Sequence, residues 1–156
     1  MGFMMIKVLQ FVAMLLTAVA MAAGWAHLLA LPNKMTLSHD DYLMVQQIYR
    51  GWSLLGIVVF GSLMSTLVLT ILVRGDLKST FALTLTALLC IIGAQVIFWA
   101  FTFPVNQETE NWTVLPKTWM QLRSRWEYSH AAGAVLNLSA FIALILAARK
   151  PSRIPR

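Results

Sequence analysis

Side chains that could do chemistry gather on one helical face near the end of the chain. Arg123, Trp126, His130 and Asn137 follow one another at steps of three, four and seven residues. Such steps place side chains on the same face of an α-helix. Histidine can accept a proton, arginine can stabilise an anion, and tryptophan offers a flat surface to an aromatic molecule. Because ionisable residues are costly inside a membrane, this face predicts a functional site.

A second histidine is expected at a similar depth. His27 lies one turn before the end of the first apolar segment, and His130 begins the last one. We therefore expect the two histidines to meet across a helical bundle. Gln95 lies about 12 Å below the end of the third segment, at 1.5 Å per residue, where it would form the floor of a pocket. The alternative for Gln95 is a hydrogen bond that joins two helices.

Metal binding is a weaker alternative for these residues. Glu127 and His130 have the Glu-x-x-His spacing of di-iron bundles, but that site needs the motif twice and two further glutamates. Because Glu108 and Glu110 lie on a loop, the sequence argues against di-iron chemistry. A mononuclear metal, or a haem between two histidines, stays open, and we predict no cofactor. The weak candidates for metal ligands are His27, His39, Glu127 and His130.

The composition predicts the elements that must position these residues. Of the 156 residues, 59% are hydrophobic and 12% charged, which is more apolar than a typical soluble domain. Four apolar segments approach the ~20 residues that cross a bilayer, and backbone groups in lipid require helices. The predicted fold is therefore an all-α bundle of four transmembrane helices in a single domain, residues 1–156. We expect the helices at about 8–31, 39–73, 80–103 and 116–148.

Local signals refine the helix ends. Ser38 and Asp41 fit a capping box that begins an outer extension of the second helix. Pro116 fits the first turn of a similar extension of the fourth. A cleaved secretory signal is the alternative for the first segment, since Ala18-Val19-Ala20 resembles a cleavage site. The apolar run continues to Leu31, which favours a retained helix.

The charge distribution predicts the orientation. One side of the bundle holds seven basic residues and one acidic residue, and the other holds five of each. By the positive-inside rule, we expect both termini in the cytoplasm, with a bacterial inner membrane as the location. The basic tail, residues 149–153, then lies near anionic lipid headgroups, which argues against a nucleic-acid partner. Every tryptophan and tyrosine falls on the opposite, outer side.

Three short motifs resemble a known family in their order and spacing. They are Gly24-Trp25-Ala26-His27 followed by Pro32, Phe103-Pro104-Val105-Asn106, and Arg125-Trp126 followed by His130. Together they resemble the anthrone-oxygenase-like family of small four-helix membrane proteins over nearly the whole chain. Members often carry an arginine where this chain has Gly133.

The resemblance implies a membrane-embedded monooxygenase that oxidises a polycyclic aromatic or quinol-like substrate with molecular oxygen. It implies catalytic roles for His27, His130 and Asn106. A histidine would be the base, and Asn106 with Arg123 would stabilise an enolate oxygen. Trp126, Trp119 and Trp99 would form a flat wall for the substrate in a pocket above Gln95.

A different class of function stays open. The chain could be a non-catalytic membrane module that binds haem, quinone or lipid, or a subunit of a larger membrane complex. Partners expected under either class are the lipid bilayer and a hydrophobic aromatic small molecule. The sequence leaves the oligomeric state undecided.

Overall fold

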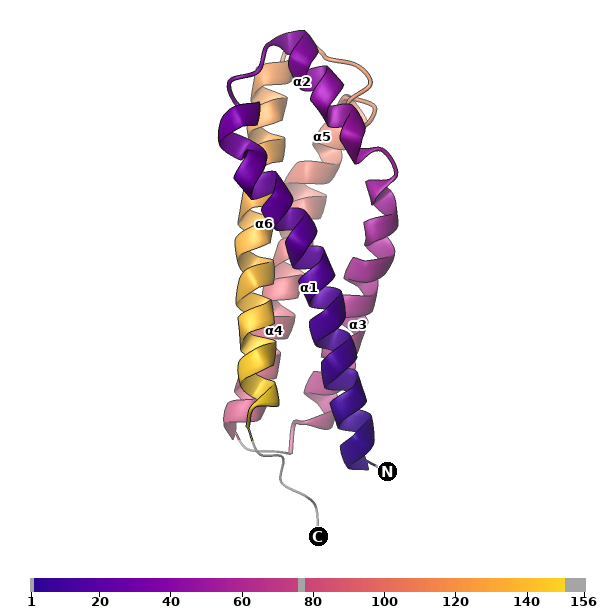
Figure 1. Ribbon diagram of the computed structural model, residues 1–156, viewed down its shortest axis with the longest axis vertical. Coiled ribbons are helices and arrows are strands. Elements are labelled where there is room, and N and C mark those ends of the chain that lie inside the picture. Colours follow the sequence, from indigo (N-terminus) through magenta and orange to yellow (C-terminus); the bar gives the residue numbers. More distant parts are fainter. Residues whose placement is uncertain (1, 76–77, 151–156) are drawn as a thin grey trace.

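The protein is an all-helical bundle built on four long helices. The computed structural model describes residues 2–75 and 78–150, and this part contains helices but no strand. The long helices are α1 (Gly2–Lys34), α3 (Leu55–Leu72), α4 (Lys78–Ile97) and α6 (Trp119–Ala148). Helix α6 packs against both α1 and α4, and α3 packs mainly against α1 (Figure 1). The predicted fold class is confirmed.

Four segments are long and apolar enough to cross a membrane, and the protein is an integral membrane protein. They are Met4–Lys34, Trp52–Leu72, Lys78–Glu108 and Trp119–Ala148. Large apolar side chains face outward on them, such as Phe11, Phe60 and Leu89, which are more than half exposed in the isolated chain. In a bilayer these side chains contact lipid rather than water.

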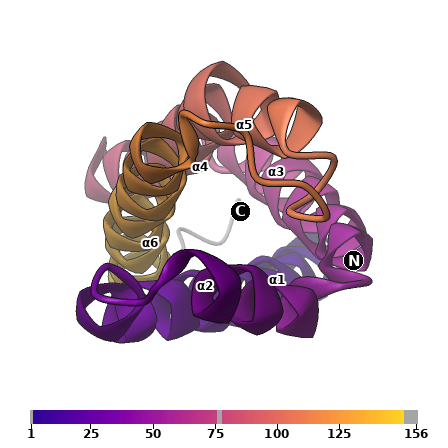
Figure 2. The ribbon, with the colours of Figure 1, turned by 90° about the horizontal axis from the view of Figure 1, so that it is seen from above.

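Short elements are concentrated at one end of the bundle. Two are helices, α2 (His39–Gln46) and α5 (Phe103–Glu108), and they lie at the end away from the first turn of α1 and the last turn of α6 (Figure 1). We call this the loop end; it also carries residues 109–118. Seen along the bundle axis, α2 lies over α1 and α5 lies over the α4 side (Figure 2).

The extension of the second helix begins as predicted but is not continuous. Ser38 caps α2, since its Oγ accepts a hydrogen bond from the Asp41 backbone N–H at 3.3 Å. The predicted helix at 39–73 is then divided by two 3₁₀ turns, Gln47–Tyr49 and Trp52–Leu54. Gly51 lies between them at φ 82°, a left-handed conformation that a glycine adopts without steric cost and that an α-helix cannot contain.

The ends of the other long helices differ from the predicted ones by two to six residues, except that α6 ends at Ala148 as predicted. Helix α1 continues through Pro32 to Lys34. Beyond α4 the chain forms a π-helical turn, η3 (Phe98–Thr102), before α5. Pro104 lies in the first turn of α5, where its missing N–H costs nothing. Pro116 precedes α6 rather than beginning it. The basic tail lies outside the described residues from position 151 onward.

Two clusters form the core. One, in the half of the bundle away from the loop end, contains Leu69, Ile91 and Leu144 with small residues such as Ala13 and Ala140. The other, at the loop end, contains Tyr42, Val105, Trp112, Leu122 and Trp126. Between α1 and α3, the Thr17 and Ser62 hydroxyls are hydrogen-bonded at 2.7 Å.

Close approach of α1 and α6 depends on Gly24. A Cβ atom added there would lie 3.2 Å from both the Cα and the Cβ of Ala134 on α6. Small residues at such crossings let transmembrane helices pack by van der Waals contact. Gly24 therefore sets the distance between the helix that carries His27 and the helix that carries His130.

We expect Gly24→Leu to destabilise the bundle by about 1–3 kcal/mol, because the added side chain forces α1 away from α6. Gly56→Leu is the matched control, since a Cβ at Gly56 meets nothing within 4 Å. Thermal unfolding of both variants in detergent, followed by circular dichroism, makes the comparison. Equal melting temperatures for the two variants would contradict this account of the crossing.

Candidate functional site

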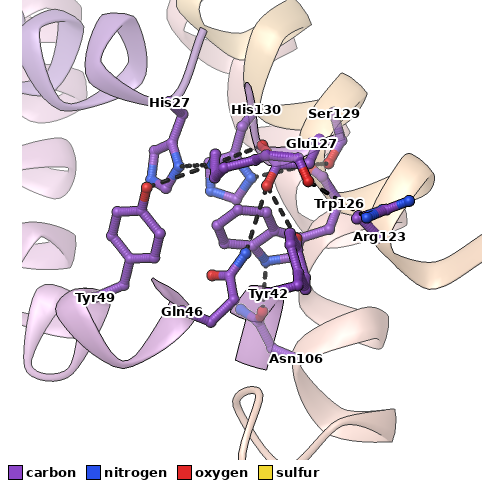
Figure 3. A network of polar contacts seen from close by, with 11 residues as sticks. His27, Tyr42, Gln46, Tyr49, Asn106, Arg123, Trp126, Glu127, Ser129 and His130 are labelled. Carbon is purple, nitrogen blue, oxygen red and sulfur yellow. Dashed lines mark hydrogen bonds and ion pairs between the residues drawn. The ribbon is translucent and has the colours of Figure 1, made fainter. Parts of the chain in front are cut away.

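The loop end contains a buried ion pair. Lys34 Nζ lies 2.7 Å from Glu127 Oε2, and the two side chains are 3% and 0% exposed. Tyr42 donates its hydroxyl hydrogen to Glu127 Oε1 at 2.9 Å, and Gln46 Nε2 donates to the same oxygen at 3.4 Å (Figure 3). Among the described residues, the Lys34 ammonium is the sole polar partner of Oε2. Removal of either charge would leave the other buried and uncompensated.

The last turn of α1 places Lys34 in this pair. Since α1 continues past Pro32, Lys34 stays on the helix, seven residues after His27 and on the same face. Its ammonium lies 3.4 Å from His27 Nδ1 and 3.4 Å from the Tyr49 hydroxyl. One cation thus contacts an acid, an imidazole and a phenol.

Arg123 anchors the end of α1. Its Nη1 donates to the Leu37 carbonyl at 2.9 Å and to the Lys34 carbonyl at 3.3 Å. The guanidinium also lies over the Trp119 ring at 4.6 Å and over the Tyr42 ring at 5.4 Å. Carbonyls at a helix C-terminus need such donors. Arg123 therefore holds the turn from which Lys34 projects.

Three aromatic side chains meet beside the ion pair. The ring centroids of His27 and His130 are 4.3 Å apart, those of Trp126 and His130 4.1 Å, and those of His27 and Trp126 4.9 Å. His130 Nδ1 lies 3.0 Å from the Trp126 carbonyl oxygen, which can only accept. Nδ1 therefore carries the hydrogen, and Nε2 of the neutral ring is left as a proton acceptor.

Further contacts tie α6 to the elements that follow α4. Trp126 Nε1 donates to Asn106 Oδ1 at 2.7 Å. One turn of helix away, Ser129 and Thr102 share a hydrogen bond of 2.7 Å. Thr102 ends the π-helical turn, and such turns occur frequently at functional sites.

A strained turn at residues 110–112 packs against Tyr42 and Trp126. Glu110, Asn111 and Trp112 have φ values of 49°, 56° and 62°, which are unfavourable for residues other than glycine. The turn brings the Trp112 ring to 5.0 Å from Tyr42 and 5.9 Å from Trp126, and Trp112 is buried. The surrounding contacts must offset this strain.

The two tyrosines of the network, Tyr42 and Tyr49, stay protonated. Burial, together with the Glu127 carboxylate, raises the pKa of Tyr42 far above its ordinary value. The same two causes raise the pKa of Tyr49 to about 12. Both phenols are therefore protonated at neutral pH and stabilise the charges beside them by hydrogen bonding.

The structure brings part of the predicted site together. His27, His130, Trp126 and Asn106 form one contiguous cluster. The cluster is packed ring against ring, and the two surface hollows lined by Ile97 to Ala132 and by Asp40 to Thr113 lie elsewhere. Gln95 is half-buried and makes no hydrogen bond to another described residue.

The predicted tryptophan wall is not formed. Trp99 is 60% exposed and contacts the rings of Phe98 and Phe103. Trp119 packs under Arg123 and next to His39. Of these three tryptophans, only Trp126 contacts His27 and His130. The π-helical turn directs Trp99 away from the two histidines, and the direction of α6 does the same for Trp119.

The four weak metal candidates do not form one ligand set. His39 is exposed, and its Nδ1 pairs with Asp40 Oδ1 at 2.6 Å. Glu127 is held by Lys34 and Tyr42. Across residues 2–75 and 78–150, no three or more His, Cys, Asp or Glu side chains are placed to hold a metal ion. A haem between His27 and His130 would require their rings to separate.

Sequence reasoning missed four side chains that contact Glu127 or His27 directly or through Lys34. They are Lys34, Tyr42, Gln46 and Tyr49. In the sequence, Lys34 follows the first apolar segment and is one of the five basic residues on the outer side. The available signal was its spacing of seven residues from His27, together with a Pro32 that does not end the helix. Tyr42 and Gln46 follow the capping box at a helical spacing of four, so they share a face of α2.

Comparisons with family models, with curated proteins and with solved structures found no match for this chain.

We expect Lys34→Met to cost about 3–5 kcal/mol of unfolding free energy, because it leaves the Glu127 carboxylate buried without its cation. The double variant Lys34→Met, Glu127→Leu should recover much of this loss, since neither charge then remains. Lys117→Met, an exposed lysine at the same end, is the control and should be nearly neutral. Chemical denaturation in detergent measures these three variants and Glu127→Leu alone, which completes the cycle. A double variant whose loss equals the sum of the single losses would refute the pairing.

Proposed function

We propose that this protein is a membrane-embedded oxidoreductase that acts on a hydrophobic aromatic substrate, polycyclic or quinol-like, with molecular oxygen. The observation that carries the proposal is the buried cluster of acid–base groups among aromatic rings, centred on Lys34, Glu127, His27 and His130. Such a cluster can move protons in surroundings that favour an apolar ring. The sequence motifs that resemble the anthrone-oxygenase-like family lie at three of its positions, His27, Asn106 and His130.

The proposed reaction begins with removal of a proton from an activated CH₂ group. His130 Nε2 accepts this proton, and the substrate is left as an enolate. Lys34 replaces Arg123 as the proposed cation for the enolate oxygen, because the Arg123 guanidinium already binds two carbonyls. The two longer contacts of Lys34, each 3.4 Å, are those that a substrate oxygen would replace.

The overall change balances without an external reductant. The electron-rich enolate carbon reacts with O₂ to form a peroxide anion, which takes the proton back from His130 and becomes a hydroperoxide. The hydroperoxide then loses water and leaves a carbonyl group. Each CH₂ group and one O₂ thus give one carbonyl group and one water. Substrate carbon supplies all the electrons that reduce oxygen, and the histidine is regenerated. The proposal needs no cofactor.

One observation favours the alternative of a binding module without turnover. The rings of His27, Trp126 and His130 contact one another, so an aromatic ligand must move at least one of them aside to enter. A module that binds quinone or lipid at the rim of the cluster would need no such movement. The two functions differ in oxygen consumption.

Oxygen uptake by the full chain in lipid nanodiscs, with anthrone as the probe, tests the proposal. We expect protein-dependent uptake above the spontaneous rate, with one O₂ consumed per carbonyl formed. His130→Ala should lower kcat/KM at least about 100-fold, the contribution of a general base. Lys117→Ala, exposed at the same end, is the control and should retain full activity. If anthrone quenches the tryptophan fluorescence but no oxygen is consumed, the protein is a binding module instead.

We also propose that the protein lies in the inner membrane of a bacterium. Its N-terminus and C-terminus would then lie in the cytoplasm, and the loop end would lie on the outer side. The basic residues Lys7, Arg74, Lys78 and Arg149 at the opposite end support this orientation. A fluorescent protein fused after Lys150 should fluoresce, and alkaline phosphatase fused there should be inactive. Alkaline phosphatase inserted in the exposed turn at Thr113 should be active. The reverse pattern would invert the orientation.

A further inference from the structure

A shallow groove runs along the outside of the bundle, between the end of α4 and α6. It has a volume of about 430 Å³ and is separate from the histidine cluster. Its lining residues are Ile97, Phe101, Ser124, Arg125, Tyr128, Ser129 and Ala132. Most of this surface is apolar, as expected where a groove faces lipid acyl chains.

Arg125 is the single charged residue of the groove, and it is held in place. Its Nη2 donates to the Ala100 carbonyl at 2.7 Å, and its guanidinium lies over the Phe101 ring at 5.4 Å. Ala100 belongs to the π-helical turn η3, so this turn anchors the arginine. The remaining guanidinium N–H groups are available to a ligand, because the side chain is exposed.

The positive charge of Arg125 has no carboxylate partner among the described residues. The Lys34–Glu127 and His39–Asp40 pairs do not include Arg125. A charge on a membrane-spanning helix is costly unless it is paired or reaches the headgroups. A negative group from outside the chain would provide the pair.

The position of Arg125 along α6 corresponds to the lipid headgroups. From Ala148 back to Arg125 the helix rises about 35 Å, at 1.5 Å per residue. The hydrocarbon core is about 30 Å thick and the whole bilayer about 40–45 Å. With the last turn of α6 at one hydrocarbon boundary, Arg125 lies just beyond the other, at the level of the phosphates. Tyr128 is 58% exposed one turn deeper, where its hydroxyl also reaches the interface.

We propose that this groove binds an anionic phospholipid of the surrounding bilayer. Arg125 holds the phosphate by charge-assisted hydrogen bonds. The Ser124 and Tyr128 hydroxyls border the headgroup, and Ile97, Phe101 and Ala132 contact an acyl chain. The groove thus fits a ligand with a negative head and an apolar tail, and it does not depend on the proposed oxidoreductase activity.

Native mass spectrometry of the full chain tests the proposal, with phosphatidylglycerol and phosphatidylcholine as probes. Wild-type protein should retain phosphatidylglycerol more tightly than phosphatidylcholine. Arg125→Gln should weaken phosphatidylglycerol binding about fivefold, the contribution of one basic residue near an anionic surface. Arg125→Lys, which keeps the charge, should retain most of the preference. Arg50→Gln is the matched control, because Arg50 is also exposed at the loop end but lies outside the groove.

A second variant tests the apolar part of the groove. Ala132→Trp fills it and should reduce retention of both lipids, whereas inorganic phosphate should displace neither. Equal phosphatidylglycerol binding by wild type and Arg125→Gln would overturn the proposal, as would an equal loss in Arg50→Gln. If Ala132→Trp instead abolished self-association and left lipid retention unchanged, the occupant would be a second copy of the chain.

Discussion

The buried Lys34–Glu127 pair is the interaction on which the arrangement of the loop end depends. It joins the last turn of α1 to α6, and Tyr42 and Gln46 attach α2 to the same carboxylate. Two charges removed from water are stable only if their geometry is good and their other polar atoms are satisfied. The Tyr42 phenol and the Gln46 amide bind the carboxylate, the Tyr49 phenol binds the ammonium, and Arg123 binds the Lys34 carbonyl. The polar contacts at the loop end are therefore connected, and the Glu127 carboxylate joins α1, α2 and α6.

The histidine–tryptophan cluster is supported by that framework rather than independent of it. His27 reaches Lys34 along one face of α1, and His130 follows Glu127 by one turn of α6. Gly24 lets these two helices approach closely just below the rings. The spacing of the histidines is consequently set by backbone packing, and their hydrogen-bonding state by the Trp126 carbonyl and the Lys34 ammonium. Proton transfer among neighbouring groups is the chemistry that such an arrangement favours.

The π-helical turn connects two surfaces of the bundle. On its inner side Thr102 is hydrogen-bonded to Ser129, and on its outer side the Ala100 carbonyl anchors Arg125. A wider turn redirects carbonyl groups away from the regular helical ladder, so side chains of α6 can bind them. One irregular turn thus contributes both to the interior cluster and to the groove that faces lipid.

The sequence by itself determined the membrane helices, their number, and the gathering of aromatic residues at one end. Hydrophobic length requires helices in lipid, and this constraint acts within each segment. The capping box at Ser38 and the meeting of His27 with His130 were also predictable, from local hydrogen bonding and from equal depth. The division of the second helix at Gly51 was not, because glycine tolerates both helical and left-handed conformations.

Tertiary structure alone decided which charges are buried. Lys34 looks like a loop charge in the sequence, yet it pairs with Glu127. Arg123 is predicted to face a substrate, yet it closes the end of α1. Trp99 and Trp126 look alike, although one faces outward and the other packs against two histidines. Pairing and ring contact join residues far apart in the chain, so they depend on helix rotation and on where each helix ends, and no local pattern encodes either.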